Sequence, residues 1–204
     1  NHNKVMAKAH TPYIALLNDD IVLHEGALDT LIDYLDAHPT VGLVAPKLVN
    51  TDGSYQVSMY ADPTLLRMVY KISGLARLTR QGGVLRALLM RSRLMRLPSL
   101  RVPHEAETVD IVKGAVMVVR LSAYQQVGGM DEVSKAYGEE ADWHLRFRQA
   151  GWQVAIVPQA VVTHIDSGQS QLKAQGWQLV EDRRAILNYF IKHKPAWQAR
   201  VIRL

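Results

Sequence analysis

The chain of 204 residues contains no cysteine. Disulfide bonds, thiolate metal sites and cysteine nucleophiles are therefore excluded. No apolar run reaches the roughly 18 residues of a membrane-spanning helix, so no part of the sequence is expected to cross a bilayer. The chain begins with Asn1 rather than methionine, and no signal peptide follows, so we expect a segment cut from a longer protein. At roughly 100–200 residues per domain, the length predicts a single domain.

Acidic residues are missing from one long stretch of the sequence. Between Pro63 and His104 there are eight arginines and one lysine, but no aspartate or glutamate. The whole chain has 24 basic and 19 acidic residues, and without these nine cations its net charge would fall from +5 to −4. The basicity thus belongs to one segment, which argues against a nucleic-acid partner and favours a local anionic one.

Apolar residues are interleaved with the cations of 63–104. This pattern is typical of helices that lie on anionic lipid, and it predicts peripheral contact with an anionic membrane. Arginine also suits the binding of phosphate groups, such as those of a lipid-diphosphate acceptor. The alternative is a solvated loop that forms a lid over the active site.

Buried strands alternate with amphipathic helices along the chain. Short apolar runs predict strands at 13–17, 41–45, 109–121, 152–157 and 160–163. Helical spacing of apolar residues predicts helices at 25–38, 138–150 and 175–194. This alternation predicts an α/β layered domain with a mixed, mostly parallel sheet and flanking helices.

Polar residues follow the first predicted strand. Asn18, Asp19 and Asp20 stand where the apolar run ends, and ligands of open α/β sheets bind beyond the carboxyl ends of strands. Carboxylates there suit Mg²⁺ or Mn²⁺, which prefer oxygen ligands. His164, at the exit of another strand, could complete the metal shell. The alternatives are a helix-capping turn and a structural histidine.

Three carboxylates, those of Glu139, Glu140 and Asp142, stand at the start of a predicted helix. Neighbouring negative charges raise the pKa of a carboxyl group, as a general base that deprotonates a hydroxyl requires. The alternative is stabilisation of the helix dipole, since acidic residues are ordinary in a first turn. Trp143 on the same helix is expected to pack in the core or to stack on a sugar ring.

Taken in order, these motifs resemble the family 2 glycosyltransferases, in particular their bacterial rhamnosyltransferase-like branch. The resemblance runs from Asn1 to about Lys194. It is carried by Leu17–Asp20, Val44–Leu48 with Asp52–Gly53, Gly114–Arg120, Val127–Glu132, Glu139–Arg146, Ala150–Trp152 and Val157–His164. Each motif is weak alone, but their common order and spacing make the match specific.

The resemblance implies a GT-A fold and an inverting, metal-dependent transfer of a sugar from a nucleotide diphosphate donor. Glu140 falls where the family usually has the aspartate that acts as base, with Glu139 and Asp142 as its neighbours. The implied ligands of Mn²⁺ or Mg²⁺ are Asp20, Asn18, Asp19 and His164. The residues expected to bind donor or acceptor are Asn3, Gly114, Ala115 and Trp143.

The resemblance also predicts the organisation of the chain. We expect residues 1–194 to form the catalytic and acceptor part of a GT-A domain, with a basic helical insert at 63–104 and a C-terminal tail at 195–204. Family members carry about 70–90 further residues, which read the base and ribose, before the stretch that Asn1 begins. The fold is therefore expected to be incomplete at its N-terminus, and the chain alone to bind nucleotide-sugars weakly and to lack activity.

The expected partners are a nucleotide-diphosphate sugar, with rhamnose as the sugar that the resemblance implies, and a surface-polysaccharide or lipid-linked acceptor. The enzyme would work in the cytoplasm, at the inner face of the membrane. A sheet without its first strands has an exposed edge, which predicts self-association.

Two other functions stay open at this stage. One is a metal-dependent nucleotidyltransferase of related fold, although that reaction needs no base of the kind that the acidic helix offers. The other is a non-catalytic membrane-surface or interaction module in which 63–104 is the working part.

Overall fold

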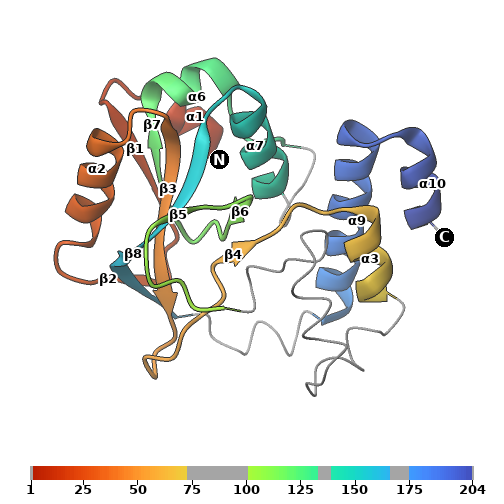
Figure 1. Cartoon of the computed structure of the whole chain (residues 1–204), viewed down its shortest axis with the longest axis horizontal. Coiled ribbons are helices and arrows are strands. Elements are labelled where there is room, and N and C mark those ends of the chain that lie inside the picture. The colour runs from red at the N-terminus through yellow and green to blue at the C-terminus, as the bar shows by residue number, and fades with distance from the viewer. Residues whose placement is uncertain (1, 73–100, 133–138, 166–174, 204) are drawn as a thin grey trace.

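The structure is a computed structural model that describes residues 2–72, 101–132, 139–165 and 175–203. A six-stranded mixed sheet lies at its centre, with helices on both faces (Figure 1). The strands of this sheet are β1 (Tyr13–Leu17), β7 (Val116–Arg120), β3 (Val41–Val49), β8 (Gln153–His164) and β2 (Ile21–Leu23) in spatial order, with β5 (Glu107–Thr108) also on β8. The strands β4 (Met59–Tyr60) and β6 (Ile111–Val112) pair separately.

The helices of the described residues fall into two groups. Those that cover the sheet are α1 (His2–Met6), α2 (Ala27–Ala37), α6 (Leu121–Val127) and α7 (Glu139–Gln149). Those that gather to one side of it are α3 (Leu65–Ile72), α9 (Gln175–His193) and α10 (Ala196–Arg203), here called the three-helix unit (Figure 1).

The predicted α/β fold is confirmed, but fewer strands run in parallel than expected. Strands β3 and β8 pair in parallel, whereas β1–β7, β3–β7, β2–β8 and β5–β8 pair in antiparallel fashion. Strands β1, β3 and β8 therefore run in one direction, and β7, β2 and β5 in the other. A strand that is buried on both faces is apolar along its length whichever way it runs in the sheet. Its sequence therefore does not reveal whether it is parallel or antiparallel to its neighbours.

Each face of the sheet has its own apolar core. On one face, α2 buries Ala27, Leu31 and Leu35, whose spacing of four residues places them on one side of the helix. On the other face, α7 buries Trp143 and Phe147 by the same spacing. The two covered faces explain why β3 is an almost continuous apolar run rather than an alternating one.

Two predicted strands have different limits in the structure. The run expected at 109–121 is divided into β6 and β7 by the connection at 113–115. The runs expected at 152–157 and 160–163 form the single strand β8, and the pairing with β3 shifts register around Pro158. Proline has no N–H to donate to a neighbouring strand, so a bulge accommodates it.

The three-helix unit has a small core of its own, made by Tyr189, Phe190 and Ala199 with Leu65 and Met68 packed against it. The segment 195–204, expected as a tail, thus includes a helix that packs on α9 and α3. Of the basic insert at 63–104, the structure describes 63–72 and 101–104, and the helices expected between them lie outside the described residues. Within the described residues, no helix is long and apolar enough to span a bilayer.

Candidate active site

The connection between β6 and β7 brings the candidate residues together. Lys113, Gly114 and Ala115 are consecutive, yet each contacts a different candidate element. The Lys113 ammonium lies 3.4 Å from His164 Nδ1, and the Ala115 carbonyl accepts a 2.9 Å hydrogen bond from the Asn18 backbone N–H. Gly114 lies directly beneath Glu140. Three segments that are far apart in the sequence therefore meet at one place.

Asp20 and His164 lie side by side, as the sequence predicts. Strand β2 pairs with β8 so that Ile21 stands opposite His164, and the Asp20 carbonyl accepts a hydrogen bond from Ile165 N–H. The distance from Asp20 Oδ1 to His164 Nε2 is 3.2 Å. Oδ1 is buried and accepts no hydrogen bond, although the Asp20 side chain is 43% exposed as a whole. This buried, unsatisfied oxygen and the neighbouring imidazole nitrogen are of the types that bind divalent metal ions.

The contacts of the other ring nitrogen, Nδ1, determine which tautomer of His164 is present. His164 Nδ1 lies 2.7 Å from Gln56 Oε1, which also accepts from Lys113 Nζ at 3.0 Å. The Gln56 Nε2 donates to Asn50 Oδ1, which sets the orientation of the amide. Because an amide oxygen only accepts, Nδ1 must donate its proton to Gln56. In the neutral ring, Nε2 then turns its lone pair toward Asp20, as in histidines that bind metals.

In the described part of the chain, Asp20 and His164 are two candidate ligands of a metal shell. Among the described residues, no group of three or more His, Asp or Glu side chains is close enough to hold a metal ion. Asn18 and Asp19 are exposed, and their part in a metal shell stays a prediction. A site with two protein ligands fits a cation that takes its other ligands from water and substrate phosphates, as Mg²⁺ commonly does.

Glu140 lies against the backbone of Gly114. A Cβ placed on Gly114 would be 2.5 Å from Glu140 Oε1, which is too close for any carbon atom. The glycine inside this connection is therefore explained by the carboxylate above it. The preceding residue, Glu139, is half-buried, and its atom Oε2 is buried without a hydrogen-bond partner. Both glutamates are thus partly withdrawn from solvent, which favours a role in proton transfer.

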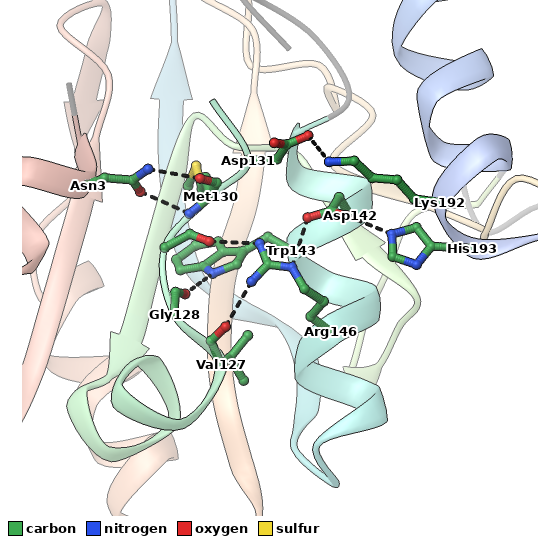
Figure 2. Close-up of polar contacts among 11 residues, drawn as sticks. Asn3, Val127, Gly128, Met130, Asp131, Asp142, Trp143, Arg146, Lys192 and His193 are labelled. Atoms are coloured by element: carbon green, nitrogen blue, oxygen red, sulfur yellow. Dashed lines mark hydrogen bonds and ion pairs between the residues drawn. The ribbon is translucent and has the colours of Figure 1, made fainter. Parts of the chain in front are cut away.

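Asp142 forms polar contacts within α7 and between α7 and α9. Its carboxylate accepts a 2.8 Å hydrogen bond from Arg146 Nε and lies 2.7 Å from His193 Nε2 of α9 (Figure 2). Burial raises the pKa of Asp142, but the bonds from His193 and Arg146 outweigh it and hold the pKa below its usual value. Asp142 is therefore charged and joins α7 to α9. The carboxylates of Asp142 and Glu140 do not share one environment.

The structure corrects the expectation that Trp143 stacks on a sugar. The Trp143 side chain is 0% exposed and packs edge-on against Phe147 in the core. Its Nε1 donates a 2.8 Å hydrogen bond to the Gly128 carbonyl, which anchors the loop after α6 (Figure 2). No substrate can reach an indole that is buried in this way.

Asn3 holds the same loop from the opposite side. Its amide donates to the Met130 carbonyl at 2.8 Å and accepts from the Met130 N–H at 2.9 Å (Figure 2). Gly129 leaves the room for this contact, since a Cβ there would collide with the Asn3 amide. The contribution of Asn3 to donor or acceptor binding stays a prediction, and in this structure its amide positions 129–132.

Sequence reasoning missed two polar residues of the site. Lys113 could have been suspected, because it directly precedes the glycine of a recognised motif. Gln56 carries no such signal, since it lies in an irregular stretch and meets His164 only through folding. His144 was also not singled out. It is fully buried, and burial together with the charge of Arg148 lowers its pKa to about 3, so it is neutral at physiological pH.

A mixed α/β sheet with helices on both faces, and with an acid–histidine pair at its strand ends, agrees with the GT-A fold that the motifs predict. The chain belongs to the glycosyltransferase-like family 2, whose model matches residues 1–185. The prediction made from the motifs is thereby confirmed.

Two curated relatives of Mycobacterium tuberculosis carry specific names. An N-acetylglucosaminyl-diphospho-decaprenol L-rhamnosyltransferase is 30% identical over 152 residues, which is 74% of this chain and 46% of the relative. A pre-mycofactocin glycosyltransferase is 30% identical over 163 residues, or 79% of this chain and 28% of the relative. The chain thus spans about half or less of the length of these relatives.

A solved structure supports the fold. The crystal structure of GalNAc-T7 with UDP, GalNAc and Mn2+ matches 80% of this chain and 29% of its own, with a TM-score of 0.51 and 13% sequence identity. At this identity the similarity concerns the fold alone, which is the predicted GT-A fold.

Proposed function

We propose that this chain is the catalytic part of a glycosyltransferase that moves a sugar from a nucleotide diphosphate donor to a hydroxyl of a glycan or lipid-linked acceptor. The observation that carries the proposal is the meeting of Glu140, His164 and Asn18 at the three consecutive residues 113–115. It brings a candidate base and a candidate metal pair to one edge of the sheet. The name of the rhamnosyltransferase relative supports rhamnose as the sugar and a diphospho-lipid as the acceptor.

The proposed reaction is a single displacement. As the acceptor oxygen attacks the anomeric carbon of the donor sugar, the Glu140 carboxylate takes the proton from that oxygen. The bond from the anomeric carbon to the diphosphate oxygen breaks with its electron pair, and the nucleotide diphosphate leaves. Attack from the face opposite the leaving group inverts the configuration at that carbon. Gly114 lets the Glu140 side chain lie low against the backbone.

Charge on the leaving diphosphate has to be stabilised. Asp20 and His164 would hold Mn²⁺ or Mg²⁺, and this cation would supply Lewis-acid stabilisation of the diphosphate. Lys113 adds a positive charge beside His164, and Gln56 orients the His164 ring through its Nδ1 proton. The amide of Gln56 is thus a positioning group for the imidazole.

Three finer predictions belong to the same proposal. The acceptor is lipid-linked, so the enzyme works at the inner face of the membrane. The basic segment 63–104 contacts anionic lipid there. The chain associates with itself through the edge of its sheet, where β1 pairs only with β7 in the described part of the chain.

The proposal is tested by Glu140→Gln in a protein extended to the full length of its gene product. We expect turnover of nucleotide-sugars with Mn²⁺ to fall by about 10²–10⁴-fold, the range of a lost general base, while donor binding by calorimetry is retained. Glu25→Gln is the matched control, because Glu25 is exposed and lies before α2, away from the site.

Near-normal turnover of Glu140→Gln would move the role of base to Glu139. The metal pair is tested without activity, by titrating Mn²⁺ and a nucleoside diphosphate into the chain. His164→Ala should weaken Mn²⁺ binding, and His38→Ala, at an exposed histidine after α2, should not. Equal Mn²⁺ affinity in all three proteins would contradict the metal assignment.

A further inference from the structure

The structure brings two acid-free segments of the chain together. From Arg183 to the C-terminus there are six basic residues and no acidic ones, just as 63–104 has nine and none. Helix α3 lies in the first of these segments, and α10 with most of α9 lies in the second. Leu65 and Met68 of α3 pack against Phe190 and Ala199 of the other two helices. The rest of the chain, which includes Glu181 and Asp182 in the first half of α9, keeps nine basic and all 19 acidic residues, a net charge of −10.

The same helices expose an unusual share of apolar side chains. Among the described residues, 12 large apolar side chains are exposed, and half of them lie on α3, α9 and α10, which have only 8, 19 and 8 residues. These six are Leu66, Val69, Val180, Ile191, Trp197 and Val201. Figure 1 shows the three helices together at one side of the sheet, so the exposed side chains belong to one part of the molecule.

Helix α10 shows how this surface is organised. Ala199 is buried and Ile202 half-buried, so this side of the helix faces α9 and α3. The other side exposes Trp197, at 56%, and Val201 one turn later, with Arg200 between them. Tryptophan, aliphatic residues and arginine on one helix face are typical of helices that lie in the interface of a membrane.

We propose that the three-helix unit docks on the surface of an anionic lipid bilayer. Trp197 and Val201 enter the headgroup region, and Arg200 and Arg203 bind lipid phosphates. The sequence predicts membrane contact for segment 63–104 alone, and this proposal adds α9 and α10 to the contact. A second copy of the same surface is a poor partner, because two strongly basic units would repel each other. The negative charge of the remaining chain is repelled by the bilayer, which turns the three-helix unit toward the lipid.

This inference extends the proposed membrane contact and does not depend on sugar transfer. Its test uses the 204-residue chain and vesicles of phosphatidylcholine, with or without phosphatidylglycerol. We expect sedimentation with the vesicles only when phosphatidylglycerol is present, and less of it as salt is raised. A blue shift of tryptophan emission should accompany binding and should be lost in Trp197→Phe.

Paired variants separate the surface from the rest of the chain. Removing Arg200 and Arg203 by changes to glutamine should lower partitioning about fivefold for each charge. The matched control for these charges changes Lys4 and Lys8 to glutamine. For the apolar contact, Trp197→Ser should weaken binding and its control, Val5→Ser, should not. The control residues lie on or next to α1, outside the three-helix unit. Circular dichroism confirms that each variant is folded.

Three results would overturn the proposal. One is equal sedimentation with both kinds of vesicle. Another is equal loss of binding in the control and test variants. The third is a dimer that Trp197→Ser dissociates and that vesicles do not, which would assign the surface to a second copy. Retained turnover of nucleotide-sugars by the full-length protein in any of these cases would leave the proposed enzymatic function unaffected.

Discussion

The chain has only two phenylalanines, and the structure places one in each of its two regions. Phe147 lies in the core between α7 and the sheet, where it touches Trp143 and has many buried apolar neighbours. Phe190 lies in the three-helix unit, where the buried core is much smaller. Both side chains are 0% exposed. Equal burial thus occurs in two very different surroundings, one supported by a sheet and one by helices alone.

The contacts that join the two regions end on or near α7, and they are both apolar and polar. Ala141 and Leu145 of α7 pack against the small core of the three-helix unit. His193 binds Asp142, Lys192 pairs with Asp131 in the loop before α7, and Arg148 pairs with Asp62 ahead of α3 (Figure 2 shows the first two). The helix that carries the proposed base is therefore held on the sheet side by a large apolar core, and on the helical side by a small apolar contact together with charged contacts. This difference predicts which changes affect stability and which affect catalysis.

The largest expected effect is on folding. Phe147→Ala should lower the free energy of unfolding by about 3–5 kcal/mol, because the sheet core cannot collapse around the cavity. Phe190→Ala should cost less, because the small helical core can adjust. Urea denaturation of both variants measures the difference. If Phe190→Ala cost as much as Phe147→Ala, the two regions would be one cooperative core, and the comparison would fail.

The next effect concerns the site alone. Gly114→Ala should displace the Glu140 carboxylate, because the new methyl group takes its place. A displacement of a catalytic group by about 1 Å lowers turnover by about 10²-fold, which is the loss we expect. The free energy of unfolding should change little, because the half-exposed Glu140 side chain can move. Kinetics and denaturation on the same full-length protein test this. The control is Gly151→Ala, in the turn after the far end of α7, where the loss of a glycine with a positive φ should affect stability only.

The smallest effect is a pH dependence of the contact between the regions. The pKa of Asp142 is lower in the folded state than in the unfolded chain, so its charged form stabilises the fold. This stabilisation is fully present above a pH of about 4, the ordinary pKa of an aspartate, and is lost as the pH falls through the folded pKa. Asp142→Asn should cost about 1–3 kcal/mol near neutral pH, and progressively less as the pH falls below the ordinary range of an aspartate. A cost that stayed the same as the pH falls would show that the charge of Asp142 does not link α7 to α9. Asp29→Asn, in the first turn of α2, is the control.

Much of the fold could be predicted because apolar periodicity is a local property. The helix predicted at 175–194 is observed at Gln175–His193, and the one at 25–38 is observed at Ala27–Ala37. Strand direction was not predictable, since it depends on connections and neighbours. The division of the run at 109–121 was not predictable either, because β6 pairs with β4 whereas β7 pairs with β1 and β3, and these partners come from other parts of the chain.

The candidate site was predictable where its residues follow strands. The approach of Asp20 to His164 was expected, because both stand at strand ends of one sheet, and the structure confirms it. The pairing of Gln56 with His164 was not, because an isolated glutamine in a loop has no pattern that marks it. The sugar-stacking role of Trp143 was wrong for a related reason: a tryptophan on an amphipathic helix has the same spacing whether it meets substrate or core.

By itself, the sequence determined which residues are apolar at which period, where charge of one sign accumulates and which family the motifs resemble. These properties depend on neighbouring residues in the chain, so they can be read without coordinates. Only the tertiary structure decided that Asp142 is a link to His193, that Lys113 and Gln56 adjoin His164, and that two acid-free segments form one basic unit. Each of these facts is a contact between residues distant in sequence, and such contacts exist only once the chain has folded.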